Sequence, residues 1–116
     1  MGTMRDRQID GALQTLGLAR RAGVVVIGQD RVLDRLRRGE RFFIITTDDC
    51  AASVLSKVAR YAESGSVRLW EIDGVTREEL GQAMGVRSAQ IAALPVESGF
   101  ADRLTKLLNL GKQGGV

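Results

Sequence analysis

The sequence predicts an α/β fold, a three-layer α/β/α sandwich in which helices cover both faces of a four-stranded mixed sheet. Short β-branched runs alternate along the chain with segments of helical periodicity. Such alternation is typical of crossover connections around a largely parallel or mixed sheet. The 116 residues are enough for one domain and too few for two. We therefore expect one domain with a helix-covered sheet.

The first half of the chain is predicted to hold three helices and two strands. In order, a helix, a strand, a helix and a strand are expected at residues 6–22, 24–27, 29–38 and 42–47. The last of these is a continuous apolar run of the kind that a sheet buries on both faces. A third helix then follows and ends at Ser64, and we expect Asp48 or Asp49 to cap its N-terminus.

The second half adds two strands and two helices, which begin at recognisable caps. Strands are expected at residues 67–72 and 91–96, with Pro95 marking an edge position or a strand end. Thr76 and Glu79 have the spacing of a capping box, and Ser98 is suited to cap the last helix. The residues expected to be buried between the helices and the sheet are Ile44, Ile45, Val54, Val58, Leu69, Leu80, Ile91, Leu104 and Leu107.

The domain is expected to span residues 6–111. Residues 1–5 are interpreted as an artificial addition or a flexible start, and residues 112–116 as a flexible tail. This start is compatible with a domain cut from a longer polypeptide that carries another nucleic-acid-associated domain, and the sequence leaves open whether the native chain extends before residue 4. No secretory leader or membrane-spanning apolar run is recognised, which favours a cytoplasmic protein without a membrane partner.

The composition excludes much catalytic chemistry. The chain contains no histidine and one cysteine, Cys50, so that histidine-dependent triads and the usual zinc clusters are ruled out. We therefore expect no catalytic residues, no metal and no cofactor. A half-buried, inert Cys50 is favoured over a nucleophile, because the adjacent Asp48 and Asp49 oppose ionisation of the thiol.

Positive charge is concentrated in the first third of the chain. Residues 1–41 carry a net charge of +4 and residues 42–116 a net charge of −1. Within the second helix, helical spacing places Arg31, Arg35 and Arg38 on one stripe, to which Arg20 and Arg21 could add. The stripe is interpreted either as a phosphate-binding surface or as an ordinary solvated face paired with nearby acidic residues.

Glycines bound the short strand that precedes this helix. Gly23 and Gly28 flank residues 24–27, but neither the P-loop nor the dinucleotide-binding fingerprint is present. Structural glycines at a tight turn are the favoured interpretation. A backbone approach to RNA phosphate at the start of the helix stays open.

Three segments carry a resemblance to a known family. They read LGLARRAG at residues 16–23, FFIITTD at residues 42–48 and ELGQAMG at residues 79–85, with the Gly28 turn between the first two. Together they resemble the ribosomal protein L7Ae/L30e family, especially its bacterial members, over roughly residues 8–108. The resemblance implies an L30e-like fold and binding of structured RNA, such as kink-turns or ribosomal RNA, with ribosome association.

The resemblance also implies where RNA would bind. The family uses the loop and first turn of its second helix and the loop after its fourth helix, which correspond here to residues 28–34 and 86–90. The implied RNA-binding residues, together with the arginine stripe, are Gly28, Gln29, Asp30, Arg31, Arg35, Arg38, Val86, Arg87 and Ser88. The family motif G-[TS]-N-E-x-x-K retains only its glycine here, because Asp30, Arg31 and Asp34 replace its Asn, Glu and Lys.

Two classes of function are therefore compatible with the sequence. One is a non-catalytic RNA-binding domain, and the other is a protein-interaction or regulatory domain that keeps the fold without specific RNA readout. Fold alone does not separate them. A continuous positive surface around Gly28, Arg31, Arg35 and Arg87 would favour RNA, and a surface interrupted by acids would favour protein interaction.

Overall fold

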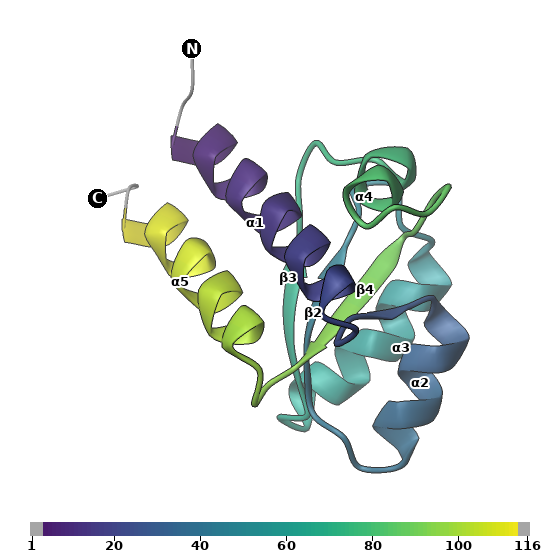
Figure 1. The fold of residues 1–116 in the computed structure, drawn as a ribbon. Coiled ribbons are helices and arrows are strands. Elements are labelled where there is room, and N and C mark those ends of the chain that lie inside the picture. The colour runs from purple at the N-terminus through teal and green to yellow at the C-terminus, as the bar shows by residue number, and fades with distance from the viewer. Residues whose placement is uncertain (1–3, 114–116) are drawn as a thin grey trace.

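The computed structural model describes residues 4–113. Within them the chain forms five helices and four strands: α1 (Met4–Arg21), β1 (Val26–Ile27), α2 (Gln29–Arg37), β2 (Phe42–Thr46), α3 (Ala52–Glu63), β3 (Val67–Glu71), α4 (Arg77–Ala83), β4 (Ile91–Pro95) and α5 (Gly99–Gln113) (Figure 1). The predicted order of elements is thus confirmed.

The four strands form one mixed sheet in the order β1-β4-β2-β3. β2 and β3 run parallel, whereas β4 runs antiparallel to β1 and to β2. Pro95 is the last residue of β4, which is an inner strand of the sheet. Pro95 therefore marks the end of a strand. Proline has no backbone N–H to donate within a sheet, and at a strand end this loss does not interrupt the ladder.

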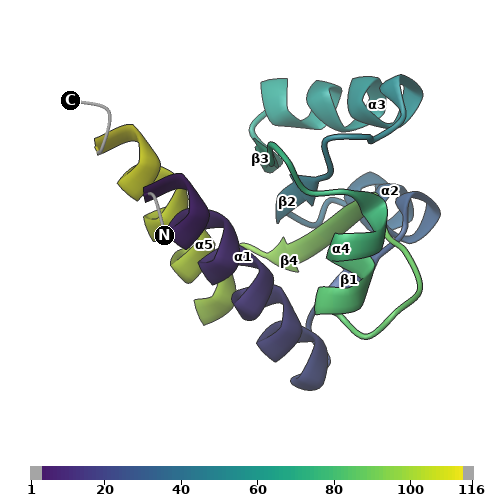
Figure 2. The same cartoon turned by 90° about the horizontal axis from the view of Figure 1, so that it is seen from above.

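Helices cover both faces of this sheet, as the α/β/α prediction requires. α1 and α5 lie side by side on one face with α4 beside them, and α2 and α3 cover the other (Figures 1 and 2). Alternate residues of β2 serve the two faces. Phe43 and Ile45 belong to the apolar cluster under α1 and α5, and Phe42 and Ile44 to the cluster under α2 and α3.

Seven of the nine residues expected in the core are buried, and Leu69 and Leu107 are only half-buried. Leu69 lies on β3, an edge strand of the sheet. Leu107 lies on α5, which extends beyond the sheet together with α1 (Figure 1). Its side chain packs instead against Gly11 of α1, where a Cβ atom would come within 2.9 Å of it. Both leucines therefore have one open side.

The bounds of several elements differ from the prediction. β1 is two residues long, and α1 begins at Met4. α5 continues to Gln113, so residues 112 and 113 are helical, contrary to the tail predicted there. The rest of that tail and residues 1–3 lie outside the described residues. Among the helices of residues 4–113, none combines the length and the apolar character needed to cross a membrane.

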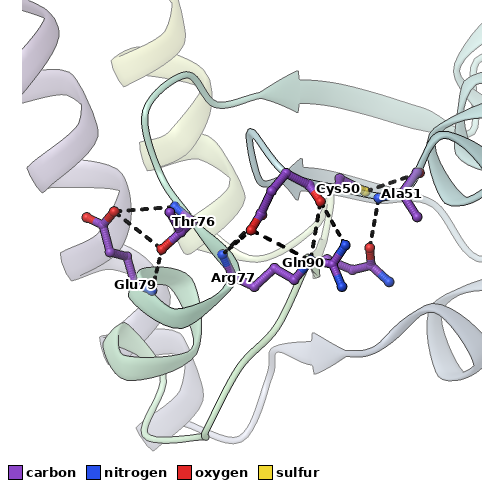
Figure 3. Close-up of polar contacts among 7 residues, drawn as sticks. Cys50, Ala51, Thr76, Arg77, Glu79 and Gln90 are labelled. Atoms are coloured by element: carbon purple, nitrogen blue, oxygen red, sulfur yellow. Dashed lines mark hydrogen bonds and ion pairs between the residues drawn. The ribbon is translucent and has the colours of Figure 1, made fainter.

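The predicted caps of the last two helices are confirmed. Thr76 Oγ1 accepts the Glu79 backbone N–H at 3.2 Å, and the Glu79 carboxylate accepts the Thr76 backbone N–H at 3.3 Å (Figure 3). Ser98 Oγ accepts the backbone N–H of Ala101 at 3.2 Å. These contacts satisfy amides that have no partner within their own helix.

The prediction that Asp48 or Asp49 caps α3 is wrong. The N-cap of α3 is Ala51, whose backbone N–H donates to the side-chain oxygen of Gln90 at 2.9 Å (Figure 3). The Asp49 carboxylate accepts the backbone N–H of Arg77 at 3.1 Å, and the Arg77 guanidinium donates to the Asp49 carbonyl at 2.9 Å. The aspartate therefore binds the start of α4, a long-range partner that local spacing does not reveal.

Candidate nucleic-acid interface

The turn between β1 and α2 presents the start of a helix without a side-chain cap. Gly28 adopts φ +97°, a left-handed conformation that L side chains rarely adopt. Its carbonyl accepts the Val32 N–H at 3.1 Å, which begins the helix. No side chain accepts a hydrogen bond at this cap. The first-turn amides are therefore available to an anion, with which the helix dipole interacts favourably.

A hollow of about 370 Å³ lies beside this turn. We call it the α1–α2 hollow, and its lining residues are Arg20, Gly23, Val25, Ile27, Arg31 and Val86. Arg20 comes from the end of α1, Arg31 from the first turn of α2 and Val86 from the loop after α4. Two arginines line this hollow and no acidic residue does. The hollow thus combines cationic groups from two helices with the aliphatic residues Val25, Ile27 and Val86.

The loop at residues 86–90 is brought to this hollow by the sheet. Ile27 pairs with Ala92 in the antiparallel β1–β4 ladder, so the end of β1 lies next to the start of β4. Gly81 of α4 lies directly under the loop, because a Cβ atom there would come within 2.6 Å of the Ser88 Cα. This close approach gives a physical reason for the glycine in the LGQAMG segment.

The later part of the arginine stripe is engaged with acidic residues. Arg35 Nη2 lies 2.7 Å from Glu40 Oε1, Arg35 Nε donates to the same carboxylate at 3.0 Å, and the guanidinium lies over the Phe42 ring. This hydrogen bonding raises the pKa of Arg35 and lowers that of Glu40. Arg38 pairs with Asp34 at 3.0 Å. The stripe therefore does not form one continuous cationic surface.

The structure brings together only part of the set expected from the sequence. Arg31 and Val86 line the α1–α2 hollow, Gly28 directly follows its lining residue Ile27, and Arg87 and Ser88 are exposed on the adjoining loop. Gln29 and Asp30 lie in the first turn of α2, where Asp30 is exposed and adds a negative charge. Arg35 and Arg38 lie further along the helix, in their ion pairs. Arg20 was expected only to add to the positive field of the stripe, because the sequence does not reveal that the end of α1 and the first turn of α2 line one hollow.

Cys50 does not have the surroundings of a reactive thiol. It is half-buried, and its Sγ lies 3.7 Å from the carbonyl oxygen of Ala51 (Figure 3). Burial raises the pKa of the thiol above its usual range, and Asp49 and Glu71 add to this against the opposing effect of Arg77. Among the residues that the structure describes, no group of three or more acidic or cysteine side chains could hold a metal ion.

The fold and this surface define a small α/β/α domain with a cationic hollow beside an uncapped helix start. A sequence profile of the ribosomal protein L7Ae/L30e/S12e/Gadd45 family matches residues 10–105. The chain belongs to this family. The resemblance inferred from the three sequence segments is thus confirmed.

Two relatives support the assignment at the sequence level. The RNA-binding protein YlxQ of Bacillus subtilis is 30% identical over 94 residues, which cover 81% of this chain and 91% of YlxQ. The large ribosomal subunit protein eL8 of Haloquadratum walsbyi is 27% identical over 94 residues, or 80% of this chain and 77% of eL8.

Two solved structures share the fold. A Bacillus halodurans protein of unknown function superposes with a TM-score of 0.70 at 24% identity, over 84% of this chain and 96% of that one. A 15.5 kDa RNA-binding protein of Giardia lamblia gives a TM-score of 0.64 at 14% identity, over 91% and 87% of the two chains. The L30e-like architecture predicted from the sequence agrees with both.

Proposed function

We propose that this chain is a non-catalytic RNA-binding domain of the L7Ae type, which holds structured RNA at the α1–α2 hollow and the first turn of α2. The observation that carries the proposal is the convergence of Arg20, Arg31 and uncapped helix amides beside the loop at residues 86–90. Guanidinium groups and helix N-termini are common ligands of RNA phosphates. Family membership and the RNA-binding relative YlxQ support the same conclusion.

In this proposal the predicted residues contribute unequally. Gly28 and Gln29 bring the backbone close to a phosphate, Arg31 with Arg20 neutralises it, and Arg87 with Ser88 contacts the RNA from the other side of the hollow. Asp30 opposes phosphate binding through its charge. Arg35 and Arg38 serve as outer contacts, because Glu40 and Asp34 already neutralise them.

The proposed partner is a structured RNA, with kink-turns and ribosomal RNA as the first candidates. A relative of this chain is a large ribosomal subunit protein, which favours association with the ribosome or its precursors. Association with the ribosome would place the chain in the cytoplasm.

The direct test is titration of a fluorescent kink-turn RNA at several salt concentrations. Replacing Arg20 and Arg31 together by Gln should weaken binding at least about a hundredfold, because each charged contact contributes about 1.5 to 3 kcal/mol. The slope of log K against log salt concentration should also become shallower by about 1.4 to 1.8 units, as expected for two lost phosphate contacts. The matched control replaces two exposed α5 residues, Arg103 and Lys106, by Gln. If both variants lose the same RNA affinity, RNA responds to the overall positive charge of the domain and the proposed site is wrong.

One observation favours a second function, a protein-interaction domain. The two ion pairs Arg35–Glu40 and Arg38–Asp34 make one side of α2 a mosaic of opposite charges, as is common on protein-binding surfaces. If the parent protein binds neither the kink-turn nor a straight duplex at low salt, this second function replaces the first. Pull-down with the charge-reversed Glu40→Arg variant as the control would then identify the face.

A further inference from the structure

A second cationic hollow lies between α2 and α3. We call it the α2–α3 hollow; it measures about 310 Å³ and is lined by Leu33, Arg37, Lys57, Arg60 and Tyr61. α2 and α3 lie next to each other on one face of the sheet (Figures 1 and 2). The hollow is thus separate from the α1–α2 hollow and shares no residue with it.

The charges around this hollow are unbalanced. Arg37, Lys57 and Arg60 are exposed, and none of them forms an ion pair with another residue of the described part of the chain. No acidic side chain lines the hollow. Three like charges around one small concavity repel each other, and an anion bound between them would relieve this repulsion.

The helix dipole explains only part of this arrangement. Arg37 ends α2 and Arg60 lies in the last turn of α3, where positive charge is favourable. Lys57 lies in the middle of α3, where no such benefit exists. All four polar side chains of the hollow are of types that donate to phosphate oxygens, because the Tyr61 hydroxyl is also a donor. The lining therefore matches phosphate groups better than a helix-capping role.

The two hollows lie within reach of one RNA molecule. Residues 29 and 37 are separated by about 12 Å along the axis of α2, given the rise of an α-helix. A nucleic-acid strand with one phosphate per roughly 3.4 Å covers this distance in about four nucleotides. An RNA element held at the first turn of α2 can therefore continue along the helix to the α2–α3 hollow.

We propose that the α2–α3 hollow is a second RNA contact, which binds the phosphate backbone of a stem or strand flanking the element held at the α1–α2 hollow. The inference rests on the proposed RNA-binding function. It assigns to Arg37, Lys57 and Arg60 a sequence-independent role, in which they increase affinity for longer RNAs without selecting bases.

The test compares two RNAs and three proteins. The short RNA is a kink-turn with minimal stems, and the long RNA carries about ten more base pairs, one helical turn, on each stem. The first variant combines Arg37→Gln, Lys57→Gln and Arg60→Gln, and the control combines Arg7→Gln, Arg103→Gln and Lys106→Gln on α1 and α5. The six positions are exposed, so both variants should fold, and circular dichroism would check this.

The parent should bind the long RNA at least tenfold more tightly than the short one at a fixed salt concentration of about 0.1 M. The hollow variant should lose most of this difference and about two units of the salt slope, whereas its affinity for the short RNA should change less than threefold. The control should keep the difference between the two RNAs.

Other results would overturn the proposal in distinguishable ways. If the parent binds both RNAs and the hollow variant behaves like the control, the second contact is wrong and the proposed function stands. If the parent binds neither RNA, both are wrong. If a polyglutamate peptide binds the parent but not the hollow variant, while the long RNA binds both equally, the hollow belongs to an acidic protein partner instead.

Discussion

Arg31 and Arg35 lie one helical turn apart on α2, yet their surroundings differ in charge. Arg31 lines an open hollow together with Arg20, whereas Arg35 is held by two hydrogen-bonding nitrogens on the Glu40 carboxylate. In the described structure Arg31 is free to bind a phosphate, whereas Arg35 would first have to release the Glu40 carboxylate. Helical spacing therefore shows which face an arginine occupies but not whether its charge is available.

The difference arises where α2 ends. Gly39 takes a positive φ of 93°, and the Glu40 backbone N–H turns back to donate to the Arg35 carbonyl at 3.2 Å. This turn brings the Glu40 side chain five residues along the chain to the Arg35 guanidinium. Neighbours on a helix surface lie three or four residues apart, so this pair depends on the turn and not on helical periodicity.

The largest effect is expected from Gly81→Ala. This substitution would disturb the loop beside the α1–α2 hollow and leave the Arg35–Glu40 pair intact. The added Cβ would lie 2.6 Å from the Ser88 Cα and 2.7 Å from its backbone nitrogen. The loop at residues 86–90 must then shift, which should lower the free energy of unfolding by about 1–3 kcal/mol. RNA affinity should fall about a hundredfold if Arg87 and Ser88 lose their contacts.

Urea denaturation and RNA titration of the same preparation would measure both effects. Gly99→Ala is the matched control, because no atom lies within 4 Å of the position of its Cβ. Unchanged stability of the Gly81 variant would mean that the loop adapts without cost. If the variant is destabilised but its RNA affinity is unchanged, the loop at residues 86–90 does not contribute to RNA binding.

A smaller effect, of tens of fold at most, is expected for selectivity between a kink-turn and a matched straight duplex. The acids Asp30 and Asp34 replace a neutral and a basic residue of the family motif, and each lost base contact removes about 1–3 kcal/mol of discrimination. Side-by-side titrations at one salt concentration measure the ratio of affinities. A thousandfold preference for the kink-turn would show that Gln29, Asp30 and Arg31 read the kink in another way.

Restoring two positions of the family motif sharpens this prediction. The double variant Asp30→Asn and Asp34→Lys, which keeps the proposed phosphate contact at Arg31, should bind the kink-turn more tightly than the parent, since two acids that repel phosphate are removed. It should gain little on the straight duplex, which serves as the control RNA. Equal affinities for the kink-turn would mean that the backbone of the loop at Gly28 has itself diverged.

The sequence predicted most of the fold because its determinants are local. Each helix and strand follows from periodicity, and the caps at Thr76 and Ser98 depend on residues three positions apart. The errors concern partners that are distant in sequence. Asp49 binds Arg77 across 28 positions, and Arg20 and Arg31 line the same hollow although they lie on different helices. The sequence therefore placed Arg31 and Val86 in the candidate site, but the hollow that they share with Arg20 became visible only in the tertiary structure.

A still smaller effect is expected from replacing Arg35 and Arg38 together by Ala. Their partners already neutralise them, and both pairs are substantially exposed, with 41% and 71% of the two arginine side chains accessible. Exposed pairs contribute about 0–1 kcal/mol, so RNA affinity should fall only a few fold and unfolding stability should change little. A loss as large as that of the Arg20 and Arg31 double variant, at the same salt concentration, would show that RNA displaces Glu40 and Asp34.

The smallest effect is the acid dependence of the Arg35–Glu40 pair. Hydrogen bonding to Arg35 lowers the pKa of Glu40 in the folded protein, so the pair stabilises the fold above the unfolded glutamate pKa of about 4.3. This contribution is lost as the pH falls through the lower, folded value, where protonation also releases Arg35. Urea midpoints measured from about pH 6 to about pH 3 should therefore fall slightly more steeply for the parent than for Glu40→Gln, since the variant has no carboxyl to titrate. Superimposable curves would mean that the ion pair adds nothing in solution, and Arg35 would then be as available to RNA as Arg31.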